Sequence, residues 1–261
     1  MAITYVTNQE ASSTGTVTLV NPAAVAVGDV LVGLLMWQRG VVSSITPTIT
    51  DNLNTGVWQF DPTLKYYNAT LQQEIVVGWI QCDTAGTPTL TAGSLGTAGT
   101  AFQVTQFTGF VHSPVLVTAD STVNSGTSAT IAANGFTNSA APELNIAAIT
   151  FTGGQNIGAR TGNFTDMPFR AGDADDFVAY KINTTTGNAV SFGASITSAN
   201  WSVMLASWQD AVASTAPPPV DSGGHSLISG SKYPVIGMAP LMMMPLGWII
   251  ERRRRLAGRR Q

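Results

Sequence analysis

The sequence predicts an all-β fold, built as an antiparallel β-sandwich. Charged residues make up 10% of the 261 residues, whereas soluble domains average about 25%, and the chain is rich in threonine, valine, alanine and glycine, which favour strands and turns. Short apolar or alternating runs recur throughout, separated by glycine, asparagine, aspartate, proline and serine. No part of the first 211 residues shows a sustained apolar repeat of 3.6 residues, so long helices are not expected there.

The runs that predict strands follow one another along the chain. Several are apolar at both odd and even positions, as in Trp201–Trp208, so we expect both faces of these strands to be covered. The expected strands are Thr16–Val20, Val30–Trp37, Thr46–Thr50, Glu74–Gln81, Thr87–Ala92, Ala101–Thr108, Val115–Ala119, Thr127–Ala132, Leu144–Thr152, Phe177–Asn183, Ala189–Ile196 and Trp201–Gln209.

Segments of the first half of the chain have a weak echo in the second half. The pattern has two explanations: a strand rhythm that makes all β segments look alike, or two similar halves, 15–110 and 115–211. It predicts about ten to twelve strands, in one sandwich or in two stacked half-units. The echoing pairs are Val30–Leu35 with Leu144–Ile149, Trp58–Phe60 with Phe164–Phe169, Ile75–Ile80 with Phe177–Ile182, Thr89–Ala92 with Ala189–Ala194, and Phe102–Phe107 with Val203–Trp208.

The chain divides into a β body and a C-terminal region of different composition. Residues 1–212 form the expected β-sandwich domain, 213–232 a linker rich in proline, glycine and serine, and 233–261 an apolar segment followed by arginines. Residues 1–211 carry five Lys or Arg and thirteen Asp or Glu, a net charge of −8, whereas 212–261 carry seven and two, a net charge of +5. The body is therefore expected to bind nucleic acid poorly, while the tail suits phosphate or anionic lipid.

The tail is predicted to attach the protein to a larger assembly or to a membrane. Tyr233–Ile250 has no charged residue, but three prolines make a straight membrane-spanning helix doubtful. Three interpretations are open besides a tail without function: a peptide that docks in a groove of another subunit, a membrane insertion inside an assembled particle, and a surface-sorting tail. The predicted attachment residues are Leu241, Met242, Met243, Met244, Trp248, Arg252, Arg253, Arg254 and Arg255.

Catalysis has little support in the sequence, and we expect no enzyme. His112 and His225 lie in no recognisable catalytic motif, and the single cysteine, Cys82, is expected to pack as a small apolar residue. No cofactor is expected, apart from Ca²⁺ as a weak alternative to a solvated acidic turn. The residues for such a calcium site are Asp173, Asp175 and Asp176.

Four aromatic residues lie in one stretch of the chain: Trp58, Phe60, Tyr66 and Tyr67. Core packing is their commoner fate, but exposed aromatic rings at a sandwich edge stack on sugars or anchor protein partners. Because they border a loop, Trp58, Tyr66 and Tyr67 are the predicted ligand-binding residues.

Four short phrases resemble a known family. Asn21–Val32 is similar to a "P-x-G-V-x-x-G-D-L-L-V" opening, Thr50–Trp58 to a "T-D-x-x-G-N-x-W" turn, Phe107–Phe110 to an "F-S-G-V" strand end, and Ala140–Ala147 to an "A-x-x-D-L-V-I-A" restart. Together they resemble β-sandwich domains of tailed-phage virion proteins, which include tail, fibre and decoration components. The resemblance covers about residues 15–211 and implies a jelly-roll-like sandwich with a structural or adhesive role, without catalytic residues.

The leading hypothesis is a bacteriophage virion protein, a β-sandwich displayed on the particle and attached through its C-terminal tail. Its expected partners are other virion subunits and further copies of itself, with a host-surface glycan as ligand and a membrane or nucleic acid near the tail. Met1–Gly15 lacks the basic and apolar regions of a secretory signal peptide, which weighs against the alternative, an exported glycan-binding protein of the bacterial cell surface. A third hypothesis is a sandwich-fold glycan hydrolase that uses a carboxylate such as Glu74.

Overall fold

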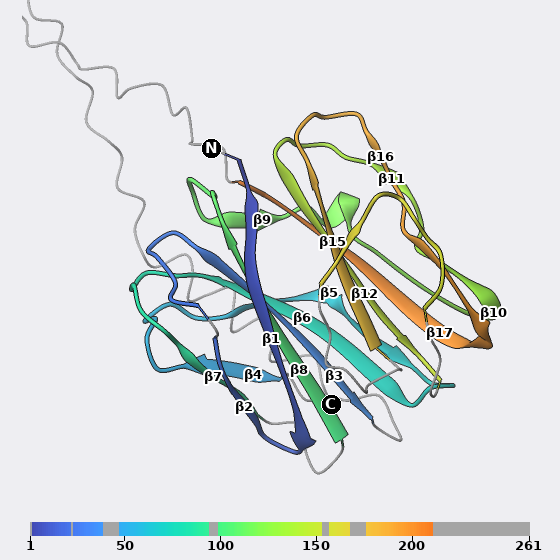
Figure 1. Cartoon of the computed structure of the whole chain (residues 1–261), viewed down its shortest axis with the longest axis horizontal. Helices are drawn as coiled ribbons and strands as arrows, with labels where there is room; N and C mark the ends of the chain where they lie inside the picture. Colours follow the sequence, from blue (N-terminus) through green and yellow to red (C-terminus); the bar gives the residue numbers. More distant parts are fainter. Residues whose placement is uncertain are drawn as a thin grey trace, which may run out of the picture. The chain divides into compact units, whose positions relative to one another are not determined.

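The computed structural model describes residues 2–21, 23–38, 47–93, 99–152, 157–167 and 176–210. Within these ranges the chain forms seventeen β-strands and one short 3₁₀ helix, η1, and no α-helix (Figure 1). The predicted all-β class is therefore confirmed. The linker and tail after residue 212 lie outside the described residues. In the described part of the chain, no helix is long and apolar enough to cross a bilayer.

The first eight strands form what we call the first β unit, residues 4–108. Five of these strands build one antiparallel sheet in the order β1-β8-β3-β6-β5, and the other three build a smaller sheet in the order β2-β7-β4. The strands are β1 (Thr4–Thr14), β2 (Val17–Val20), β3 (Val30–Gln38), β4 (Thr48–Asp51), β5 (Gln59–Asn68), β6 (Gln73–Gln81), β7 (Thr89–Gly93) and β8 (Gly99–Thr108).

The remaining strands form the second β unit, residues 114–210. Its larger sheet has the order β10-β17-β12-β15-β14, while β11 pairs with β16, and β9 and β13 pair with opposite ends of the long strand β17. The elements are β9 (Pro114–Leu116), η1 (Thr118–Asp120), β10 (Thr122–Ala132), β11 (Phe136–Thr137), β12 (Glu143–Phe151), β13 (Arg160–Thr161), β14 (Thr165–Asp166), β15 (Asp176–Asn183), β16 (Ala189–Val190) and β17 (Gly193–Asp210).

The two β units have the same strand order. If β10 is counted as the first strand of its unit, both larger sheets run 1-8-3-6-5, and both smaller sheets pair strand 2 with strand 7. This order is that of a jelly roll, except that the fifth strand extends the larger sheet instead of completing the smaller one. The five pairs of echoing segments in the sequence fall on equivalent strands: β3 and β12, β5 and β14, β6 and β15, β7 and β16, and β8 and β17.

The two larger sheets pack face to face and share a central core. Val32 and Leu34 of the first unit and Ile146 and Met204 of the second belong to this core. Trp208 is fully buried, and its ring lies edge-on to Trp79, with 5.8 Å between the ring centroids. Such a pair contributes about 0.5–1.5 kcal/mol beyond the burial of its apolar surface. The central core therefore joins the two units into one compact body, Met1–Ser214.

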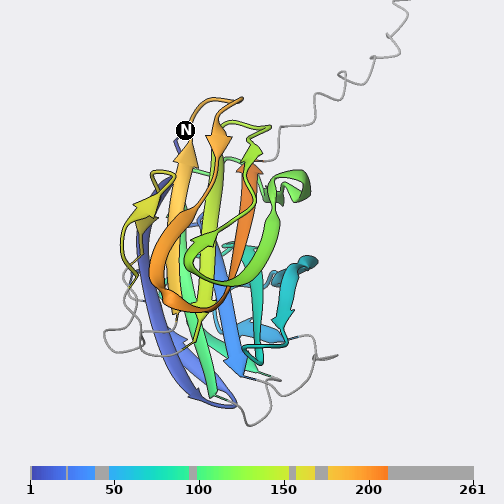
Figure 2. The same ribbon diagram turned by 90° about the vertical axis from the view of Figure 1, so that its right-hand side faces the viewer.

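Each larger sheet also buries its outer face, which produces four layers (Figures 1 and 2). In β3, Leu31 and Leu35 point away from the central core and pack with Leu19 of β2 and Leu90 of β7. A corresponding cluster in the second unit lies behind β12 and β17. Because successive side chains of a strand point to opposite faces, strands with two covered faces need apolar residues at both parities. This is the physical reason for the unbroken apolar runs in the sequence.

Candidate functional site

An open groove of about 680 Å³ lies between the first β unit and the connecting segment, residues 109–118, which leads from β8 of the first unit through β9 at the start of the second. One side comes from the start of β5 and the end of β6, including Phe60, Asp61 and Trp79. The opposite side comes from the connecting segment, including Val115 and Leu116 of β9. Volumes of this size are typical of sites for small ligands or short chain segments. The groove is therefore the candidate functional site.

The side formed by β5 departs from regular strand pairing. Gln59 and Phe60 pair with Trp79 and Gly78, but the register shifts before Lys65, so the intervening residues leave the ladder. Pro62 lies in this stretch, and a proline cannot donate a ladder hydrogen bond. The Asp61 carboxylate accepts hydrogen bonds from the backbone N–H of Thr63 (2.8 Å) and from its hydroxyl (2.6 Å). These bonds fix Asp61 at the groove.

A second carboxylate, Asp83, ties together two loops beside the groove. It accepts hydrogen bonds from the backbone N–H groups of Thr55 (3.0 Å) and Gly56 (3.1 Å), and from the Thr55 hydroxyl. The hydrogen bonds from Thr55 lower the pKa of Asp83 below its ordinary value. Asp83 is thus ionised at neutral pH and adds negative charge to the groove.

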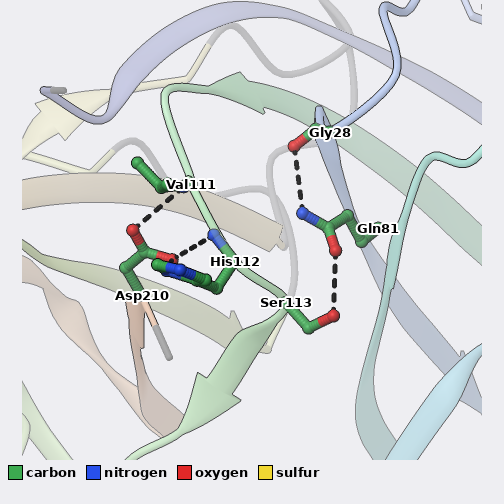
Figure 3. A network of polar contacts seen from close by, with 6 residues as sticks. All are labelled: Gly28, Gln81, Val111, His112, Ser113 and Asp210. Atoms are coloured by element: carbon green, nitrogen blue, oxygen red, sulfur yellow. Dashed lines mark hydrogen bonds and ion pairs between the residues drawn. The ribbon is translucent and has the colours of Figure 1, made fainter. Parts of the chain in front are cut away.

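The connecting segment is fixed to both β units by a polar network (Figure 3). The Asp210 carboxylate accepts hydrogen bonds from the backbone N–H of Val111 (2.9 Å) and of His112 (2.6 Å), and the Nδ1 atom of His112 lies 3.5 Å from it. The Ser113 hydroxyl donates to the side-chain oxygen of Gln81 (2.9 Å), whose amide nitrogen in turn lies 3.4 Å from the Gly28 carbonyl. The wall of the groove is therefore anchored at Asp210 in the second unit and at Gln81 in the first.

The exposed surface of the groove is aliphatic and acidic. Val57 is 77% exposed and Val115 is 44% exposed, whereas Trp79 is only 9% exposed. Asp61 and Asp83 line the groove, and no lysine or arginine does so among the described residues. Two carboxylates without a basic neighbour favour neutral or cationic ligands over anions.

The three aromatic residues predicted to bind a ligand do not gather on one surface. Trp58 is 5% exposed and lies in the outer core of the first unit. Tyr66 packs against the central core, and its hydroxyl lies 2.8 Å from the hydroxyl of Ser125 on β10. Tyr67 is half-buried on the same strand. Trp58 was nonetheless close to the groove in sequence, because both of its neighbours, Val57 and Gln59, line it.

The other predicted site residues lie outside the described residues, or partly so. Asp173 and Asp175 are not described, and of Asp176 the structure describes only the backbone, which begins β15. Among the described residues, no group of three or more His, Cys, Asp or Glu side chains is placed to hold a metal ion. The tail residues fall beyond the described ranges: Leu241, Met242, Met243, Met244, Trp248, Arg252, Arg253, Arg254 and Arg255.

Glu74, the carboxylate named for the hydrolase hypothesis, is fully buried in β6. Its side chain forms an ion pair with Lys65 of β5, with 3.2 Å between Oε1 and Nζ. A carboxylate in this position has no exposed surface to offer a sugar chain.

A pair of buried acids, Asp120 and Glu143, lies in the second unit and does not line the groove. The Asp120 carboxylate accepts two hydrogen bonds from Ser139, one from the backbone N–H and one from the hydroxyl, both 2.7 Å long. Glu143, at the start of β12, is fully buried. Burial, and then the charge of Asp120, raise the pKa of Glu143 to about 7. No sequence motif indicates this pair, because the two acids lie more than twenty residues apart.

Comparisons with protein-family models, with curated protein sequences and with solved structures yield no match to this chain.

Proposed function

We propose that this chain is a structural subunit of a tailed-bacteriophage particle, with its double β body displayed and its C-terminal region serving as the attachment. The observation that carries the proposal is the outer face of the β2-β7-β4 sheet. Its outward residues are uncharged: Thr18, Val20, Thr48, Thr50, Thr89 and Thr91. Designed soluble domains carry about 25–35% charged residues on their surface. A whole sheet face without charge is suited to contact with a neighbouring subunit.

The threonines of this face are aligned across the three strands. Thr18 pairs with Thr91, and Thr91 pairs with Thr50, so one row of hydroxyl groups crosses the sheet. The hydroxyl oxygens of Thr18 and Thr91 lie 3.1 Å apart, within hydrogen-bond distance. Threonines held in this way present a flat surface of methyl and hydroxyl groups, which packs without the desolvation cost that buried charges carry.

The composition of the C-terminal region supports its part in the proposal. In the described part of the chain, the last strand, β17, ends at Asp210. Seven of the twelve basic residues follow residue 211, together with the apolar stretch Tyr233–Ile250. A segment that combines apolar and basic residues in this way supports a role in attachment to other virion subunits.

The proposal is tested by incorporation into particles. We expect deletion of residues 211–261 to abolish incorporation while the circular dichroism of the β body is retained. The double variant Thr18→Lys/Thr50→Lys should lower occupancy, because it buries two positive charges at the contact. Val27→Lys is the matched control, since Val27 is 67% exposed in the loop before β3 and lies outside this face. Recovery of the intact chain from a bacterial outer envelope, and not with particles, would overturn the proposal.

A further inference from the structure

We propose that the groove between β5 and β9 binds an extended polypeptide segment of a protein partner, one that carries aliphatic and basic side chains. Three properties of the groove lead to this partner: its exposed aliphatic rims, its negative charge, and the two edge strands beside it. The inference does not depend on the assignment to a virion.

The rims of the groove favour aliphatic side chains. Val57 and Val115 stand on opposite sides of the groove and are among the most exposed large apolar residues of the described chain. Exposed valines that line a groove lose accessible surface when an apolar side chain enters it, and each buried CH₂ contributes about 0.8 kcal/mol.

The charge of the groove selects against anions and favours cations. Asp61 and Asp83 line it, and their carboxylates are held in place by hydrogen bonds from Thr63 and Thr55. Fixed carboxylates accept a lysine or arginine without first having to be ordered, and a basic partner adds a charge-assisted hydrogen bond.

The strands beside the groove provide backbone groups for an extended chain. In the described part of the chain, β9 pairs only with β17 and β5 pairs only with β6, so each is an edge strand. A partner in extended conformation adds to such an edge through main-chain hydrogen bonds, while alternate side chains enter the pocket beside it.

A sugar suits the groove less well than a peptide. Sugars are usually recognised by exposed aromatic faces. Here Trp79 is almost fully buried, and the ring of Phe60 lies over Gly78 of the neighbouring strand. The large apolar side chains that are exposed in the groove are the two valines, Val57 and Val115. A neutral oligosaccharide is therefore the competing ligand to include in the test.

The test is a titration of the full chain with an eight-residue peptide in which valine alternates with arginine. The control peptide has glutamate in place of arginine, and a neutral hexasaccharide is the third ligand. We expect the arginine peptide to bind, with an affinity that falls as salt is added. Equal binding of the two peptides, or binding of the hexasaccharide alone, would overturn the proposal. A peptide that is N-methylated at alternate residues should bind more weakly, and equal binding would contradict strand addition.

Variants of single residues test whether the peptide binds in the groove. Val115→Lys puts a positive charge on the exposed rim and should lower the affinity for the arginine peptide by about tenfold or more. Val6→Lys makes the same exchange on β1, at the opposite edge of the five-stranded sheet, where valine is 40% exposed, and should leave affinity unchanged. Asp61→Asn retains the hydrogen bonds to Thr63 and should weaken binding about threefold at low salt. Equal effects of Val115→Lys and Val6→Lys would show that the peptide binds elsewhere.

Discussion

Asn21 and Asn138 occupy the same place in the two β units. Each residue directly follows the second strand of its unit, and each donates its backbone N–H across to the residue before the seventh strand, Pro88 or Asn188, over 3.0 Å. Each side-chain nitrogen also donates to the carbonyl two residues further on, over 2.8 Å at Asn21 and 2.7 Å at Asn138. The two jelly rolls therefore share a local hydrogen-bonded turn as well as a strand order.

Replacement of Asn138 should destabilise the body. The Asn138 side chain donates to the carbonyls of Ala140 and Thr185 and accepts the backbone N–H of Asn188. Asn138→Ala removes three hydrogen bonds made by a side chain that is itself buried, so we expect a loss of about 1–3 kcal/mol in the free energy of unfolding. Urea denaturation measures the loss. Asn134→Ala, at an exposed position, is the control and should change stability by less than about 0.5 kcal/mol.

Glu143 should make stability depend on pH. Its pKa in the folded protein is about 7, above the ordinary 4.5, so the folded state binds the proton more tightly than the unfolded state. The resulting stabilisation is full below pH 4.5 and is lost as the pH rises through about 7; it amounts to roughly 3 kcal/mol at most. Urea midpoints at pH 5 and pH 8 measure it. Glu143→Gln stays neutral at both pH values, so it should reduce the difference between the two urea midpoints. An unchanged difference would contradict the assignment of the pH dependence to Glu143.

Cys82 should be inert in the folded protein. Its side chain is buried, and burial, followed by the charge of Asp29, raises the pKa of the thiol to about 12. Only the thiolate reacts readily, so a thiol reagent at pH 8 should not label the native chain within minutes. In about 6 M guanidinium chloride, which unfolds most proteins, the same reagent should label Cys82 fully. Rapid labelling without denaturant would show that Cys82 is accessible.

The sequence predicted the strands with two buried faces, such as β3, and several edge strands, such as β2 and β10, but it missed two other edge strands. Each of the twelve expected runs contains part of a strand, because an apolar run such as Val30–Trp37 serves two cores. None of the expected runs covers β1, which is a polar strand at a sheet edge, or β5, which contains Pro62. Edge strands bury less apolar surface, so their sequences carry less of the signal from which strands are recognised.

The groove was not predictable because its two sides come from distant parts of the chain. Val57 and Val115 face one space only because the larger sheets pack against each other and Gln81 bonds to Ser113. Trp58 shows the limit of the sequence argument: its place in the loop was close to the site, but its ring faces the outer core. The register of a strand decides which of its side chains face the core and which face outward, and packing fixes that register.

Gly78 should control the position of Phe60 and thus the shape of the groove. A Cβ atom on Gly78 would lie 2.6 Å from the Phe60 ring, far inside contact distance, so the ring lies over β6 only because this residue is glycine. Gly78→Ala should cost about 1–3 kcal/mol in stability and weaken binding of the arginine peptide. Gly99→Ala is the control, because a Cβ atom there would have nothing within 4 Å and Gly99 lies outside the groove. Adding Phe60→Leu should restore part of the stability lost in Gly78→Ala. If the second change gives no recovery, the strain lies elsewhere than between these two residues.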